Sequence, residues 1–123
     1  MILVDTSVWV DHLRAADQTL AALLENGTVL VHPFVTGELA LGHLRQRDLI
    51  LGALQDLPQA SVATDPEVLH FISLHRLFEL GIGYVDAHLL AAVRLAQGAS
   101  LWTRDQRLHD VAQQLGLAAS GLH

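Results

Sequence analysis

The 123-residue chain contains no cysteine and no lysine. The absence of cysteine excludes disulfides, thiolate nucleophiles and cysteine-ligated zinc sites. The absence of lysine excludes a Schiff-base nucleophile, the phosphate ligand of a P-loop and the switch residue of a receiver domain. No apolar run approaches the ~18–20 residues of a membrane span, and the first residues lack the pattern of a secretory signal. We therefore expect a cytoplasmic protein.

The charge balance is acidic, with 13 Asp and Glu residues against 7 arginines and a formal net charge of −6. Such a balance argues against a protein that coats nucleic acid through a basic patch. Hydrophobic residues make up 51% of the chain, which excludes intrinsic disorder and is enough to build a core. At this length we expect a single domain over residues 1–123.

Short apolar runs alternate with segments that have helical periods and capping residues. The expected strands are 2–4, 28–31, 61–63 and 100–102, with a further candidate at 117–119. The expected helices are 7–13, 18–25, one beginning at residue 33, 47–57, 65–80, 84–97 and 105–115. This alternation predicts a three-layer α/β/α fold around a mainly parallel sheet of about four to five strands. Ligands bind such sheets beyond the carboxyl ends of the strands.

Two acidic residues follow predicted strands, Asp5 after the first and Asp105 three residues after Trp102. Each could instead cap the helix that follows it. The helical period places Glu38 and Asp86 on the apolar sides of their helices. A carboxylate on a buried face costs several kcal/mol unless a partner compensates its charge.

A hard divalent cation is the economical partner for these four carboxylates, since there is no lysine to pair with them. Oxygen ligands suit Mg²⁺ or Mn²⁺ better than zinc. Two such ions can activate water and neutralise a phosphate in an in-line displacement, a reaction that requires no covalent nucleophile. The eight histidines do not have the spacing of a zinc motif.

The segments around the four acids form a more specific pattern. The chain begins with MILVDTSVWV, and TGEL at 36–39, GYVDA at 83–87 and WTRD at 102–105 follow in that order. Together these segments resemble the PIN-domain toxins of the VapC type, which come from prokaryotic VapBC toxin–antitoxin modules. The resemblance covers essentially the whole chain.

The resemblance implies a PIN fold and a Mg²⁺- or Mn²⁺-dependent endoribonuclease that produces 5′-phosphate and 3′-hydroxyl ends. The catalytic and metal-binding positions of the family map to Asp5, Glu38, Asp86 and Asp105. Its polar positions map to Thr6 and Thr103, and Arg104 is a candidate for contact with the substrate. The implied partners are RNA and a VapB-type antitoxin. The apolar content also suggests a homodimer.

Three other functions compete with this interpretation. A phosphohydrolase of the haloacid dehalogenase type would use Asp5 as nucleophile, but that family has a second Asp where this chain has Ser7, and it requires a lysine. A receiver-like phospho-switch also requires a lysine. A PIN-like module that binds RNA or protein without cleaving it is the remaining alternative, and the presence of all four acids weighs against it.

Overall fold

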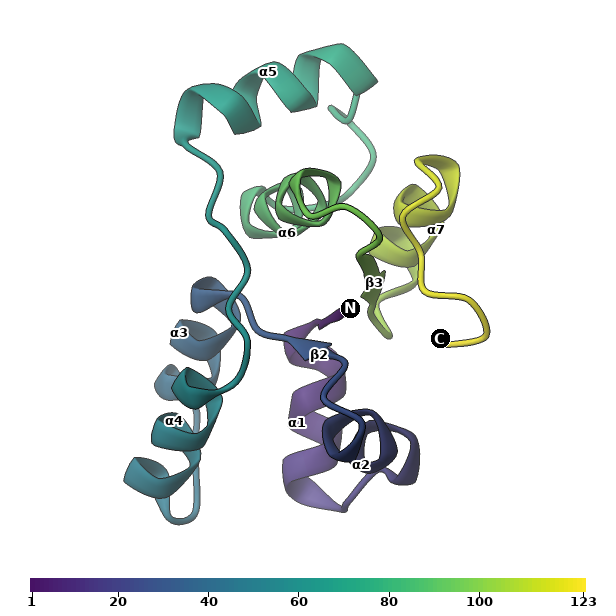
Figure 1. Ribbon diagram of the computed structural model, residues 1–123. Coiled ribbons are helices and arrows are strands. Elements are labelled where there is room, and N and C mark those ends of the chain that lie inside the picture. The colour runs from purple at the N-terminus through teal and green to yellow at the C-terminus, as the bar shows by residue number, and fades with distance from the viewer.

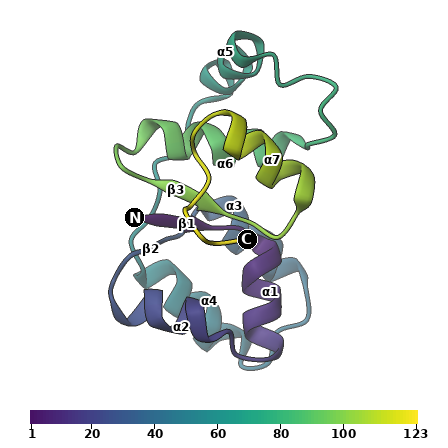
Figure 2. The same cartoon turned by 90° about the vertical axis from the view of Figure 1, so that its right-hand side faces the viewer.

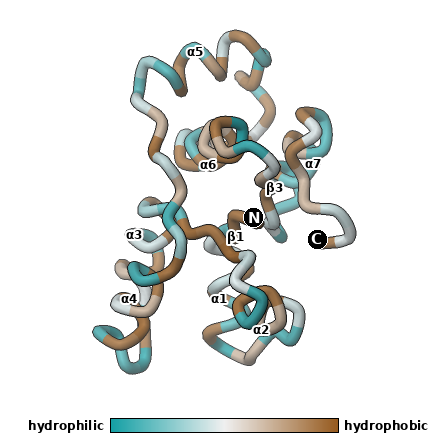
Figure 3. Tube along the Cα trace, in the orientation of Figure 1, coloured by the Kyte–Doolittle hydropathy of each residue, from teal (hydrophilic) through white to brown (hydrophobic).

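The computed structural model describes residues 1–123 and has a small parallel sheet at its centre. The strands are β1 (Ile2–Val4), β2 (Val29–Leu30) and β3 (Ser100–Trp102), in the order β2-β1-β3. Ile2 pairs with Val29 on one side and with Ser100 on the other. The strands form part of the buried core, and β1 is hydrophobic in Figure 3. Because β1 is the central strand, its carboxyl end lies in the middle of the sheet edge formed by the carboxyl ends of the strands, beyond which such folds bind their ligands.

One parallel bridge extends the sheet at each edge. Val31 pairs with Gln59, and Leu101 pairs with Ala118. Each bridge has two backbone hydrogen bonds of 2.7–2.9 Å. The predicted strand at 61–63 is therefore wrong, because pairing there is confined to Gln59. Its neighbour Pro58 has no N–H to lengthen the ladder. The segment 117–119 likewise supplies a bridge and not a strand.

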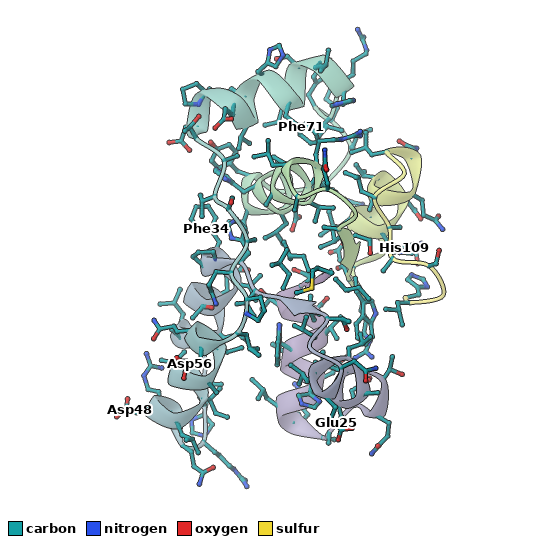
Figure 4. The ribbon with its side chains drawn as sticks, in the orientation of Figure 1. Glu25, Phe34, Asp48, Asp56, Phe71 and His109 are labelled. Atoms are coloured by element: carbon teal, nitrogen blue, oxygen red, sulfur yellow. The ribbon has the colours of Figure 1, made fainter.

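Seven helices cover the sheet in two layers, as expected for an α/β/α fold. They are α1 (Thr6–Arg14), α2 (Gln18–Glu25), α3 (Pro33–Leu41), α4 (Arg47–Asp56), α5 (Asp65–His75), α6 (Tyr84–Leu95) and α7 (Gln106–Gln114). Helices α1 to α4 lie on one side of the sheet, and α6 and α7 lie on the other (Figures 1 and 2). Helix α5 is stacked outside α6, with Phe71 between them (Figure 4). None of these helices has the length and apolar character needed to cross a membrane.

Helix α5 begins where the sequence predicts and ends earlier. Thr64 accepts the N–H of Glu67 at 3.2 Å, and the Glu67 carboxylate accepts the N–H of Thr64 at 2.8 Å, which forms a capping box. The helix ends at His75 and not at residue 80, because Arg76 adopts a left-handed conformation with φ of 54°. Left-handed helix ends usually contain glycine, so the sequence pattern pointed to the later glycine instead.

The start of α3 depends on a buried histidine. His32 is 0% exposed, and its Nδ1 accepts the N–H of Phe34 at 3.0 Å. Only a ring that is unprotonated at Nδ1 can accept this bond. Burial, together with the charge of His88, lowers the pKa of His32 to about 4. The neutral ring therefore caps the helix that carries Glu38.

This cap makes stability depend on pH. The unfolded chain binds a proton near the ordinary pKa of 6.5, whereas the folded chain binds it only near about 4. Stability is therefore complete above 6.5 and falls as the pH drops toward 4, by roughly 3 kcal/mol for a shift of this size. The variant His32→Asn keeps an acceptor for the cap and does not titrate.

We expect the free energy of unfolding to fall less with acid in His32→Asn than in the wild type, when both are measured in urea at about pH 7.5 and about pH 4.5. Comparing the two proteins cancels the contribution of the other histidines. An equal decline in both proteins would contradict the role of His32.

Candidate active site

The four predicted acids come from four elements that meet near the carboxyl ends of β1 and β3. Asp5 follows β1 directly, and Asp105 precedes α7. Glu38 lies in α3, and Asp86 lies in the first turn of α6. The negative charges of the other three all act on Asp86. The structure therefore brings the four carboxylates into one cluster, here called the acidic cluster.

Asp5 is held by two hydroxyl groups and is only 7% exposed. Its Oδ2 accepts hydrogen bonds from Ser7 Oγ at 2.8 Å and from Thr103 Oγ1 at 2.7 Å. Ser7 Oγ in turn accepts the N–H of Arg104 at 3.0 Å, and Thr103 Oγ1 accepts the N–H of Asp105 at 3.1 Å. Since an N–H can only donate, each hydroxyl proton is left to point at Asp5. These bonds leave Oδ1 of Asp5 free.

Donors of the chain also hold one oxygen of each of the other three acids. The pairs are Thr6 Oγ1 to Glu38 Oε1 at 2.7 Å, Gly83 N–H to Asp86 Oδ2 at 3.0 Å, and Leu108 N–H to Asp105 Oδ1 at 2.9 Å. The second oxygen of every carboxylate has no donor. The ion pairs of the structure all lie elsewhere, so no arginine or histidine neutralises the cluster.

Asp5 and Asp105 differ in how they serve the helices that follow them. Asp5 occupies the N-cap position of α1 but makes no capping hydrogen bond with its side chain. Asp105 does cap α7, through Leu108. The alternative interpretation of Asp5 as a simple helix cap is therefore excluded, whereas Asp105 caps a helix and also lies in the acidic cluster.

Burial and neighbouring charges both act on the carboxyl of Asp86. Burial raises the pKa of its carboxyl above the ordinary range, while the Gly83 N–H lowers it. The charges of Asp5, Asp105 and Glu38 raise this pKa further. A cation bound among these groups would relieve the repulsion and favour the ionised form of all four.

The donor set fits hard divalent ions. It consists of carboxylate oxygens alone, with one oxygen of each group free to bind. No three His, Asp or Glu side chains stand close enough to form a complete metal site as they are placed. Binding an ion would therefore require the free oxygens to move toward one another.

The surroundings of Glu38 differ from those predicted. The expectation that it lies on the buried, apolar side of its helix is wrong, because Glu38 is exposed and its apolar neighbour Leu41 is 90% exposed. The buried stripe of α3 consists of Val35 and Leu39. The hydrogen bond from Thr6, and not burial, orients the carboxylate. For Asp86 the expectation is confirmed, since it is half-buried beside the buried residues of α6.

Arg104 lies beside the acidic cluster but is paired with other acids. Its guanidinium binds Asp11 at 2.7 Å and Asp17 at 2.5 Å, and lies 5.4 Å from the ring centroid of Trp102. These bonds connect the loop before α7 to α1 and to the start of α2. The two carboxylates neutralise its charge, so contact with substrate stays a prediction.

Ser7 is a site residue that sequence reasoning missed. Its place at the start of a predicted helix has the pattern of a helix cap, a common role for serine at such a position. The available signal was its place two residues after Asp5, where a short hydroxyl side chain can reach a neighbouring polar group. In the structure it contacts both Asp5 and the backbone of the segment that carries Asp105.

The electrostatic coupling within the cluster can be measured directly. In protein treated with EDTA, we expect carboxyl NMR titration to show a pKa for Asp86 above that of exposed aspartates. Asp5→Asn removes one neighbouring charge and should lower the Asp86 pKa. Asp56→Asn is the control, since Asp56 is an exposed residue at the end of α4 (labelled in Figure 4) and is not among the charges that act on Asp86, so it should leave the Asp86 pKa unchanged. Equal effects of both substitutions would contradict the clustering.

Comparison with known proteins agrees with this architecture. The family model described as "PIN domain" matches residues 2–114, a range that includes all four acids. Ribonuclease VapC32 from two strains of Mycobacterium tuberculosis is 51% identical to the chain over 118 residues. The match covers 96% of this chain and 95% of each relative. The chain therefore belongs to the PIN-domain family, as a member of its VapC type.

Proposed function

We propose that the chain is the toxin of a VapBC-type toxin–antitoxin module and acts as a metal-dependent endoribonuclease. The observation that carries this proposal is the acidic cluster, in which each carboxylate is held through one oxygen and keeps the other free. The VapC32 relatives are named as ribonucleases. Because the proposed substrate is RNA, we also propose that the chain acts in the cytoplasm. We further propose that residues 1–123 form one domain.

The four acids would hold Mg²⁺ or Mn²⁺ directly or through water. Such ions, when bound, supply Lewis-acid chemistry that activates water and offsets the charge of a phosphodiester. The expected products have 5′-phosphate and 3′-hydroxyl ends.

The rest of the chain orients these groups. Ser7 and Thr103 fix the rotation of the Asp5 carboxylate, and Thr6 fixes that of Glu38. The turn at Gly83 holds Asp86 at the start of α6, where the helix dipole favours negative charge.

A groove beside the cluster is a suitable place for the antitoxin. It has a volume of about 610 Å³ and includes the apolar residues Val10, Leu13, Leu39 and Ile50. Arginines 14 and 45 also line it, and so does Glu38 of the acidic cluster. We propose that a segment of a VapB-type antitoxin binds here through apolar side chains and acidic groups. Because Glu38 belongs to the wall, such a segment would cover part of the active site.

A second copy of the chain is the proposed partner for another surface. Helices α5 and α6 carry exposed apolar side chains that include Leu69, Leu74 and Leu95. A groove of about 400 Å³ between these helices includes Leu74 and Leu95. Exposed apolar area of this kind is typical of an interface between proteins.

The catalytic assignment is tested by substitutions of aspartate by asparagine, which remove the charge of the side chain and keep its size and shape. We expect Asp5→Asn and Asp86→Asn to fold normally and to lose Mg²⁺-dependent cleavage of RNA by about 100-fold or more, the scale of losing one electrostatic contact in a site. Asp56→Asn should retain full activity, and excess EDTA should abolish cleavage by the wild type. Undiminished cleavage by purified Asp5→Asn would exclude the assignment. RNA binding without any cleavage by the wild type would favour the non-catalytic module.

The hydroxyls on Asp5 are tested separately. Ser7→Ala and Thr103→Val should each reduce activity by roughly 10–100-fold, as is usual for groups that orient metal ligands. They should also raise the Mg²⁺ concentration needed for half-maximal rate, which a change in folding alone would not do. Thr103→Ser restores the hydroxyl and should recover most of the activity. Ser73→Ala, on the exposed side of α5, is the matched control. A normal Mg²⁺ dependence in Ser7→Ala would contradict the positioning role.

A further inference from the structure

Arg107 is an arginine that packs against a glycine and has no partner for its charge. Its side chain lies across the backbone of Gly81, so closely that a Cβ added there would be 2.5 Å from Nη1 and 2.8 Å from Cδ. Gly81 also has a φ of +78°, a conformation that favours glycine. Arg107 takes part in none of the ion pairs or side-chain hydrogen bonds of the structure. The guanidinium therefore keeps its donors available.

The position of Arg107 connects the segments that carry two of the site acids. It follows Asp105 by two residues, in the first turn of α7. Gly81, on which it lies, comes two residues before Gly83, whose N–H holds the carboxylate of Asp86. Arg107 therefore contacts the exposed loop that leads into α6 and to Asp86.

Other arginines are engaged elsewhere. Arg104 is paired with two aspartates, and Arg47 and Arg94 donate to backbone carbonyls. Arg76 lies over the ring of Phe78, 5.5 Å from its centroid. Arginines 14 and 45 line the groove on the Glu38 side. Arg107 is therefore the arginine without a partner on the two segments that carry Asp86 and Asp105.

We propose that Arg107 binds a backbone phosphate of single-stranded RNA next to the scissile phosphodiester. An RNA strand that approaches four carboxylates is repelled, and a cation on the neighbouring loop offsets part of this repulsion. The planar guanidinium offers two parallel donors to a phosphate. Packing on Gly81 restricts the side chain before binding, which reduces the entropy lost when the phosphate binds. This inference rests on the proposed ribonuclease function and adds a substrate contact to it.

The test uses the full chain and a single-stranded RNA oligonucleotide in Mg²⁺, with kcat and KM measured over a range of salt concentrations. We expect Arg107→Gln to raise KM several-fold with little change in kcat. Loss of one phosphate contact should also make the dependence of log(kcat/KM) on log[salt] less steep by about 0.7, the value for one contact to a single strand. Arg107→Lys keeps the charge and should restore the salt dependence.

The matched control is Arg94→Gln. Arg94 follows Asp86 by eight residues along α6, which places it about 12 Å farther along the helix axis, so its substitution should leave KM and the salt dependence unchanged. Thermal unfolding of each variant checks the fold.

The possible outcomes distinguish a failure of the Arg107 phosphate contact from a failure of the proposed ribonuclease function. If the wild type cleaves RNA and Arg107→Gln has the same KM and salt dependence, the phosphate contact is wrong and the ribonuclease assignment stands. A loss confined to kcat would also overturn the contact. If Arg107→Gln weakens binding of the co-expressed antitoxin but not of RNA, the guanidinium serves the protein partner and the inference is wrong. If the wild type shows no Mg²⁺-dependent cleavage, the proposed function itself fails.

Discussion

The Asp5 carboxylate connects the central strand to the segment that follows its neighbour β3. Its Oδ2 accepts two hydroxyl protons, and both hydroxyls accept backbone N–H groups of the β3–α7 segment. The backbone N–H of Asp5 also donates to the carbonyl of Trp102 at 2.9 Å. The same bonds therefore fix the rotation of Asp5 and the position of the segment that carries Asp105. If these bonds were lost, both carboxylates would be free to separate under their mutual repulsion.

The distribution of charge follows from the same arrangement. A chain with 13 acids and 7 arginines has enough cations to neutralise only some of its carboxylates. The arginine beside Asp105 is instead paired with two acids outside the cluster. The acidic cluster is thus left without a cationic side chain in contact, which suits the binding of divalent ions. The acidic cluster accounts for part of the net negative charge of the chain, so this charge does not exclude an RNA substrate.

Much of the fold and most of the candidate site could be predicted from the sequence, because they depend on local patterns. Apolar runs identified β1 and β3, and the acids that follow them identified one edge of the site. The sequence pattern failed where the decision depended on tertiary contacts. The end of α5 is set by a left-handed arginine, and the orientation of Glu38 is set by a hydroxyl on another helix.

Ser7 and Arg107 show the same limit. A serine near a helix start has the sequence pattern of a cap whether or not its hydroxyl reaches a carboxylate. The contact between Arg107 and Gly81 joins residues far apart in the chain, so the spacing of residues contains no sign of it.

In the proposed function, four carboxylates that are each held through one oxygen bind divalent ions through the other. The most direct measurement is anomalous diffraction from crystals of the wild-type chain grown with Mn²⁺. We expect an anomalous peak among Asp5, Glu38, Asp86 and Asp105, with Asp5 and Asp86 each contributing Oδ1. A well-occupied peak elsewhere, with none in the acidic cluster, would contradict it.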